Sequence, residues 1–243
     1  ASISNCLSIG ADADSYGGES CDFKAKHKDP LFTHFSGAAK RQAKTEAQLN
    51  PDMDALGLMR ALRQHNEKVK NPFTKGSVDS VCMHAGGLVG DHTTQSMVAG
   101  ISGTAAPVIW LTGGSTPCVS VFKPYLFGNK PCAPVFAAVD KKAEEYWLTH
   151  ERFIRKLIGT VVPTDYYAER DALELGFAAE ATVNAHNAPA MAELSFYALQ
   201  KEQQFYAKWE ERIKPGSLGS RRYQAYWAKK NALLGKGRTG LEK

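Results

Sequence analysis

Apolar residues in the middle of the chain, from Val81 to Phe127, follow patterns typical of strands. Glycines and prolines separate four segments: the short apolar Val81–His84, Thr93–Ile101 with alternating polar and apolar residues, the buried-type run Val108–Leu111, and Val119–Phe127, which is rich in β-branched and aromatic residues. Such segments are typical of antiparallel strands in quick succession. We therefore predict a sheet of three or four strands. Pro124 is expected at an edge or a bulge, because proline cannot donate a ladder hydrogen bond.

After this block the apolar positions recur about every 3.6 residues, which is the period of an amphipathic helix. Capping residues at the starts and glycine or proline at the ends support this assignment. The pattern predicts three helices: from Asp140 to Gly159, from Thr164 to about Asn184, and from Asn187 to Pro215.

Patterns before the block are weaker. They predict a strand at Ser2–Ile9, a polar loop at Gly10–Lys28, a surface helix at Ser36–Gln48, and a helix that begins at Asn50-Pro51-Asp52 and ends near Asn71-Pro72. A strand-rich part followed by helices indicates an α+β fold. We place the strand-rich part at residues 1–137 and a helical region with a basic C-terminal tail at residues 138–243.

Composition is that of an ordinary globular domain, with 243 residues, 43% hydrophobic and 23% charged. No run approaches the roughly eighteen apolar residues of a spanning helix, so we expect no membrane span. The net charge is +5, and the stretch from Lys208 onward holds ten Lys or Arg residues against three acids. A solvated basic helix and coil explains this stretch better than binding to an acidic partner does. It lacks the aromatic interleaving of a nucleic-acid platform, so no nucleic acid is expected.

The five cysteines form no tight framework: Cys6, Cys21, Cys82, Cys118 and Cys132. Free thiols in a reducing compartment are expected, and the cytoplasm fits that. Cys82, His84 and His92 invite a metal interpretation. No second Cys-x-x-Cys pair completes four ligands, so the sequence predicts no metal site.

Few residues stand out as reactive. His84 follows a short strand and precedes two glycines, where a side chain can face a cleft, although a hydrogen-bonded core histidine is the commoner case. Thr93 and Thr94 offer hydroxyls beside it, or serve only as β-formers on a polar face. Asn5 lies in an apolar strand, and its amide could donate to a developing oxyanion. Cys118 follows Thr116-Pro117 and is a possible reactive thiol, although a buried cysteine that packs as a small hydrophobe is far commoner.

Five motifs carry a resemblance to a known family. In order they are ISN-x-LSI, VCMHA, HTTQSMV, a Trp-x-Thr-Gly run and PC-x-SVFKP-x-x-F, and the later helix begins KAEEYWLTHE. Their order over Ser2–Ile158 is similar to that of the secernin-type dipeptidase family of N-terminal-nucleophile amidohydrolases. The resemblance implies a four-layer αββα sandwich, a cysteine nucleophile at a mature N-terminus, and no metal or organic cofactor.

The resemblance also implies that this chain is the non-nucleophile portion of such an enzyme. The family's nucleophile lies upstream of the strand that holds Asn5, so none of the five cysteines corresponds to it, and Ala1 has no nucleophilic atom. A second chain or segment is then expected to supply the cysteine and the missing strands, as part of a heteromer. Asn5 is implied as the catalytic oxyanion donor, and His84, Thr93 and Thr94 as residues that line a site for short peptides or related amides.

A binding or structural protein that keeps this fold without catalysis is the alternative. In either case, a sandwich that lacks its first strands would expose sheet edges and one apolar face. We therefore expect a tightly associated partner.

Overall fold

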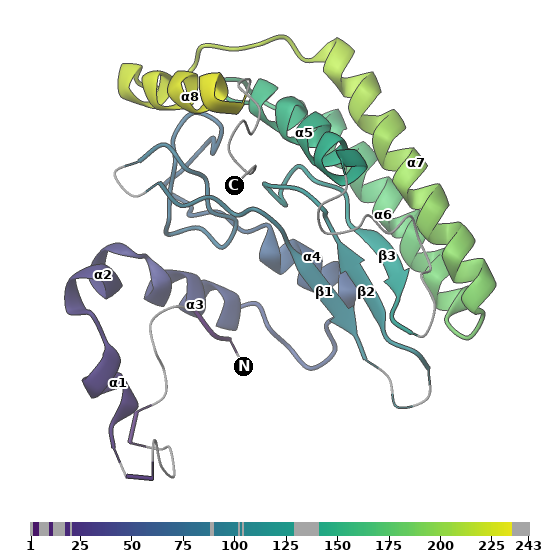
Figure 1. Cartoon of the computed structure of the whole chain (residues 1–243), viewed down its shortest axis with the longest axis horizontal. Coiled ribbons are helices and arrows are strands. Elements are labelled where there is room, and N and C mark those ends of the chain that lie inside the picture. Colours follow the sequence, from purple (N-terminus) through teal and green to yellow (C-terminus); the bar gives the residue numbers. More distant parts are fainter. Residues whose placement is uncertain are drawn as a thin grey trace.

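The computed structural model describes residues 2–4, 10–11, 18–19, 21–87, 90–101, 103, 105–128 and 141–234. Over these ranges the chain has the expected α+β fold, with eight helices and one three-stranded antiparallel sheet (Figure 1). The helices are α1 (Phe23–His27), α2 (Pro30–Phe35), α3 (Ala38–Glu46), α4 (Ala55–Leu62), α5 (Lys141–Lys156), α6 (Thr164–Asn184), α7 (Ala188–Arg212) and α8 (Arg221–Leu234). The strands are β1 (Met97–Gly100), β2 (Val108–Leu111) and β3 (Lys123–Leu126).

The sheet has the order β1-β2-β3, and its middle strand has the predicted bounds. The outer two strands are shorter than predicted. Pro124 lies in the edge strand β3, opposite Trp110, so its missing N–H costs the ladder little. The segment Val81–His84 does not form a strand. Only His84 pairs there, in an isolated antiparallel bridge with Ser77.

The two faces of the sheet differ. Val98, Trp110 and Pro124 lie opposite one another in register, and all three are buried against the core. On the other face Met97 is 58% exposed, and Ala99 is exposed as well. Among the described residues, the sheet is therefore a single β layer with one face buried against the core. The other face is open at β1, whereas at β3 Lys123 is buried there and pairs with Glu202 of α7. The four-layer sandwich remains an expectation.

The long helices α6 and α7 have nearly the predicted bounds and pack along β3 (Figure 1). Asn187 caps α7, because its side chain accepts a hydrogen bond of 3.2 Å from the amide of Ala190. No helix in the described ranges is long and apolar enough to cross a membrane.

The helix expected between Asn50 and Asn71 is much shorter. α4 begins at Ala55, because the side chain of Asp54 accepts from the amide of Gly57 at 2.7 Å and caps it. It ends at Leu62. Beyond it Asn66 and Asn71 accept hydrogen bonds from amides two residues ahead, at 2.9 Å each. Such local bonds compete with helix propagation, and periodicity alone does not reveal them.

The N-terminal part also differs from prediction. The expected loop at Gly10–Lys28 contains α1, which Asp22 caps, and α2 follows it. Ser2–Ser4 have no strand structure, and the rest of the predicted strand, with Asn5, lies outside the described residues. The predicted cap Asp140 lies outside them too.

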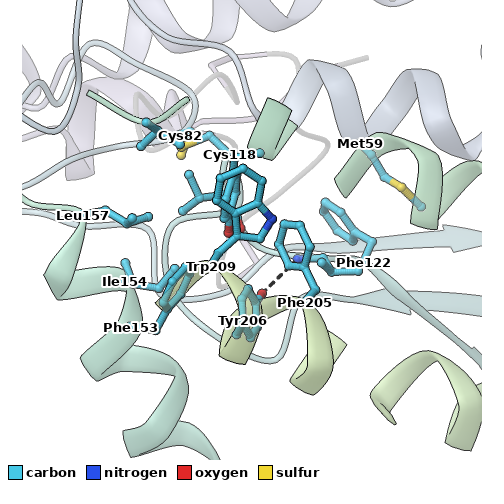
Figure 2. Packing of buried hydrophobic residues seen from close by; sticks show 14 of the residues in the cluster. Met59, Cys82, Cys118, Phe122, Phe153, Ile154, Leu157, Phe205, Tyr206 and Trp209 are labelled. Carbon is cyan, nitrogen blue, oxygen red and sulfur yellow. Dashed lines mark hydrogen bonds between the residues drawn. The ribbon is translucent and has the colours of Figure 1, made fainter. Parts of the chain in front are cut away.

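One hydrophobic core joins the sheet to the helices. Its centre is aromatic and comes from α5, α6 and α7, where Phe153, Tyr166, Phe205 and Trp209 are all buried. Figure 2 shows that Tyr206 lies at the base of this group, where its hydroxyl accepts a 3.2 Å hydrogen bond from the amide of Val121. The turn before β3 is thereby fixed to α7.

Candidate functional site

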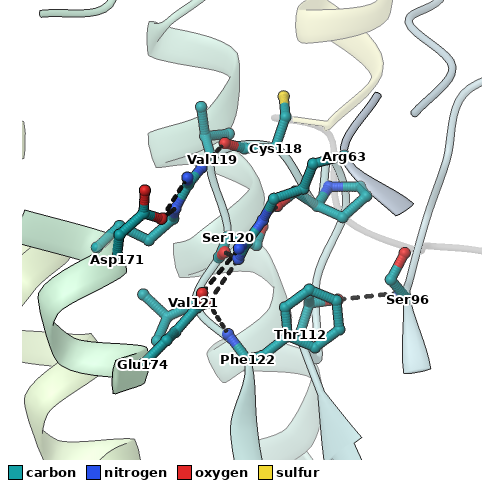
Figure 3. A network of polar contacts seen from close by, with 12 residues as sticks. Arg63, Ser96, Thr112, Cys118, Val119, Ser120, Val121, Phe122, Asp171 and Glu174 are labelled. Atoms are coloured by element: carbon teal, nitrogen blue, oxygen red, sulfur yellow. Dashed lines mark hydrogen bonds and ion pairs between the residues drawn. The ribbon is translucent and has the colours of Figure 1, made fainter. Parts of the chain in front are cut away.

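The turn that precedes β3 is held by a buried arginine at the end of α4. Arg63 donates to the carbonyl oxygen of Pro117 at 2.8 Å and to that of Ser120 at 2.9 Å (Figure 3). Its guanidinium also forms a two-pronged ion pair with Glu174 of α6, with one hydrogen bond of 2.7 Å to Oε2. Both side chains are buried, so this contact fixes α4, α6 and the turn together.

A second layer of α6 side chains holds the same turn. Glu174 accepts from the amide of Phe122 at 2.7 Å, and Tyr166 donates to the carbonyl of Val119 at 2.5 Å. Arg170 donates to the carbonyl of Cys118. Because the carbonyls of 117–120 are all bound to side chains, the thiol of Cys118 is held in one position.

Two further segments converge on that thiol. The amide of Cys82 donates to the carbonyl of Gln64 at 3.0 Å, which places the segment from Cys82 to His84 beside the end of α4. His65 follows Gln64 in the chain and so reaches the same point. The resulting Cys–His cluster consists of His65, Cys82, His84 and Cys118, and its ligand atoms all lie within 4.8 Å of one another.

His84 is at the centre of the Cys–His cluster. Its Nε2 lies 3.2 Å from Nε2 of His65, 3.4 Å from Sγ of Cys118 and 3.6 Å from Sγ of Cys82. Cys82, His84 and Cys118 are 0%, 2% and 4% exposed, and His65 is half-buried. Figure 2 places the two sulfurs at one end of the hydrophobic core.

The two thiols interact directly. Burial raises the pKa of the Cys118 thiol well above its usual value, and its hydrogen bond to Cys82 raises it further. Burial opposes ionisation of Cys82 as well, but the contacts with Cys118, His84 and His65 outweigh burial and leave its pKa well below the usual value. The pair therefore favours one thiolate, on Cys82, accepting from a thiol on Cys118.

Sequence reasoning considered His92 as a partner of Cys82 and His84, but both of its ring nitrogens are occupied. Nδ1 accepts from the amide of Ala85 at 3.1 Å, and Nε2 lies 2.8 Å from Oγ1 of Thr116. Burial and the nearby His84 lower its pKa to about 4. His92 is a neutral structural histidine.

The other predicted site residues differ in what the structure shows of their exposure. Asn5 lies outside the described residues. Thr93 is half-buried, and its hydroxyl accepts from the amide of Met83 at 2.9 Å. Thr94 is exposed, whereas His84 is buried in the Cys–His cluster and does not face solvent. Among the predicted site residues that the structure describes, only Thr94 has an exposed side chain.

Sequence reasoning missed His65 and gave Cys118 only a packing role. No spacing signature connects them to Cys82 and His84, because the four residues come from three separate segments. The only signal for this cluster in the sequence was the residue types themselves. Two thiols and two imidazoles together are a donor set suited to a metal ion.

Burial also limits what the two sulfurs can do. A nucleophilic cysteine must meet a substrate carbonyl, and neither Cys82 nor Cys118 is accessible. Comparison with known protein families, with curated proteins and with solved structures found no match to this chain. What the chain does is therefore inferred from its motifs and its geometry.

Proposed function

We propose that this chain is the non-nucleophile portion of a cysteine-dependent amidohydrolase that cleaves short peptides or related amides. The observation that carries the proposal is the series of ordered motifs over Ser2–Ile158, which resembles the secernin-type dipeptidases. The nucleophilic cysteine belongs to a partner chain or segment, which also completes the sandwich.

The open side of the sheet supports the proposal. In an αββα sandwich, each sheet carries helices on one face and the other sheet on its second face. Here Val98 and Trp110 face the core, while Met97, Ala99 and the following Ile101 are exposed at the free edge strand β1. An apolar surface of this kind suits a second sheet.

The proposed mechanism assigns one group of this chain to the chemistry. The partner's thiolate adds to the substrate carbonyl, and the α-amino group of that cysteine accepts the thiol proton. The side-chain amide of Asn5 donates to the oxyanion of the tetrahedral intermediate. Thr93 and Thr94 belong to the substrate-binding side, where the exposed hydroxyl of Thr94 binds peptide groups and Thr93 accepts from the amide of Met83.

The test is hydrolysis of a dipeptide set by the protein purified together with its partner chain or segment. Asn5→Ala should lower turnover by about a hundredfold or more with the fold intact, because one oxyanion donor contributes that much. Thr94→Val should raise KM more than it lowers kcat. An Asn5→Ala enzyme with unchanged turnover removes Asn5 from the mechanism, and a wild-type complex without hydrolytic activity overturns the proposal.

The alternative is a binding or structural protein that keeps the fold. It is favoured by one observation: the two core cysteines are inaccessible, so the described residues hold no exposed, activated thiol. Intact-mass measurement and N-terminal sequencing of the co-purified material separate the two. A mature N-terminal cysteine supports the enzyme, and its absence supports the scaffold.

A further inference from the structure

We propose that His65, Cys82, His84 and Cys118 bind one zinc ion as a structural Cys₂His₂ site. The four donors belong to the residue types that zinc prefers, and tetrahedral sites with two thiolates and two imidazoles are closed structural sites. Their ligand atoms converge on one point, within 4.8 Å of one another. The site is independent of the proposed hydrolase.

The three distances from Nε2 of His84 fit a zinc tetrahedron. With Zn–N bonds of about 2.0–2.1 Å and Zn–S bonds of about 2.3 Å, its edges are about 3.3 Å between nitrogens and about 3.5 Å between nitrogen and sulfur. The structure has 3.2 Å between Nε2 of His65 and Nε2 of His84. From Nε2 of His84 to the sulfurs of Cys118 and Cys82 it has 3.4 and 3.6 Å. All three edges already have the length that a zinc ion requires.

Hydrogen bonding alone explains this arrangement less well. An imidazole nitrogen makes one good hydrogen bond, as donor or as acceptor, yet Nε2 of His84 has three neighbours at short distance. The other ring nitrogen, Nδ1, is buried and has no hydrogen-bond partner among the described residues. A proton on Nδ1 leaves the lone pair of Nε2 directed at the centre of the Cys–His cluster, as metal ligation requires.

Charge balance favours zinc in a buried position. Two thiolates and two neutral imidazoles around Zn²⁺ sum to zero, so the site carries no net charge into the core. Zinc would hold both cysteines as thiolates, and the guanidiniums of Arg63 and Arg170, bound to the carbonyls of Pro117 and Cys118, lie close by and favour that negative charge.

The role is structural because four protein donors leave no open position for water or substrate. The ion would link three segments directly through their side chains: the end of α4, the segment from Ser77 to Ala85, and the turn before β3. Arg63 and Arg170 fix the carbonyls of that turn and so orient Cys118.

The first test is metal content and cobalt spectroscopy on the wild-type protein. We expect about one zinc per chain by elemental mass spectrometry after purification without chelator. Exchange to Co²⁺ should give the intense ligand-field bands of a tetrahedral site and a thiolate-to-cobalt charge-transfer band. Neither readout requires enzymatic activity, so the result stands whether or not the hydrolase proposal survives.

Matched variants locate the site. His65→Ala, which removes a half-buried ligand, and Cys118→Ser should each lower zinc content at least several-fold and abolish or alter the cobalt bands. Cys21→Ser and His27→Ala remove the same residue types outside the Cys–His cluster and should leave zinc content unchanged. If Cys118→Ser fails to fold, His65→Ala and the wild-type cobalt spectrum still decide.

Three outcomes overturn the proposal. One is a folded wild-type protein that contains no zinc and gives no thiolate-to-cobalt band on titration with Co²⁺. Another is a disulfide between Cys82 and Cys118, seen by mass spectrometry after alkylation under non-reducing conditions. The third is unaltered zinc content in both cluster variants, which would reject these four ligands.

Discussion

At the scale of single residues, the buried pair of Arg63 and Glu174 should contribute strongly to stability. Glu174→Gln removes the ion-pair partner of the Arg63 side chain, which is only 8% exposed. We expect a loss of about 3 kcal/mol in the free energy of unfolding, measured with urea, because breaking a buried pair strands one charge. Glu67→Gln removes the carboxylate of the exposed pair with Lys44 and should cost less than about 1 kcal/mol. Equal losses in the two variants would contradict this.

The buried His150 should make the free energy of unfolding depend on pH. Burial, and then the charge of Lys123, lower its pKa from 6.5 to about 3. Its Nε2 contacts Oγ of Ser120 at 3.3 Å, and the rings of Tyr146 and Tyr206 enclose it. Between these two pKa values the unfolded chain binds a proton that the native protein does not. Stability therefore falls as pH drops below about 6.5.

The measurement is urea unfolding from pH 7 to pH 4. His150 should account for a loss of about 3 kcal/mol over this range, at about 1.4 kcal/mol per pKa unit. His150→Gln, which does not titrate, should show a correspondingly shallower dependence. A slope identical to that of wild type would mean that His150 takes up its proton in the native state.

The sequence predicted only part of what single residues do in the structure. The cap Asn187 was predicted, because a capping residue acts on its own next few amides. The Cys–His cluster was not, because Cys118 reaches His65 only after Arg63, Arg170 and Glu174 have fixed the turn between them. The predicted roles of Asn5, Thr93 and Thr94 stay predictions.

At the scale of elements, prediction succeeded where local signals and packing agree. β2 is a buried β-branched and aromatic run, and α6 and α7 have both periodicity and start signals, so their bounds were close. The predicted length of α4 was wrong, because Asn66 and Asn71 form local turns that interrupt a continuous apolar pattern. The strand predicted at Val81–His84 does not form, because its backbone groups make hydrogen bonds to Gln64 and Ser77 and not to a neighbouring strand.

The docking of α8 gives a prediction at this scale. Gly86 has a φ of +119°, and a Cβ there would lie 2.5 Å from the ring of Tyr223 in α8. Gly86→Ala should destabilise the protein by about 1–3 kcal/mol and increase hydrogen exchange in α8 first. Gly176→Ala is the matched control in α6, where a Cβ meets nothing within 4 Å. It should stabilise by about 0.5–1 kcal/mol. Unchanged exchange in α8 would disprove the contact.

At the scale of the whole molecule, one core joins the sheet to the helices, and the Cys–His cluster lies where that core meets the loops between α4 and β3. Helices bury one face of the sheet and the β3 part of the other, whereas β1 is an outer strand of the sheet in the described part of the chain. Stability and assembly therefore depend on different surfaces, and they can be tested separately.

Assembly gives the last prediction. Met97 and Ile101 are 58% and 82% exposed at β1, where the proposed second sheet would pack. Met97→Asp and Ile101→Asp should each weaken association with the partner at least tenfold, because a carboxylate would be buried against an apolar face. Size-exclusion chromatography with light scattering, at several protein concentrations, measures this.

Val183→Asp provides the control for an added charge. Val183 is also 82% exposed, but it lies on α6, which packs along β3 and not in β1, so the substitution should leave association unchanged. Equal weakening by all three variants would indicate non-specific association through exposed apolar residues. A wild-type protein that remains a monodisperse monomer at all concentrations would show that β1 needs no partner. The sandwich, and with it the hydrolase proposal, would then have to be abandoned.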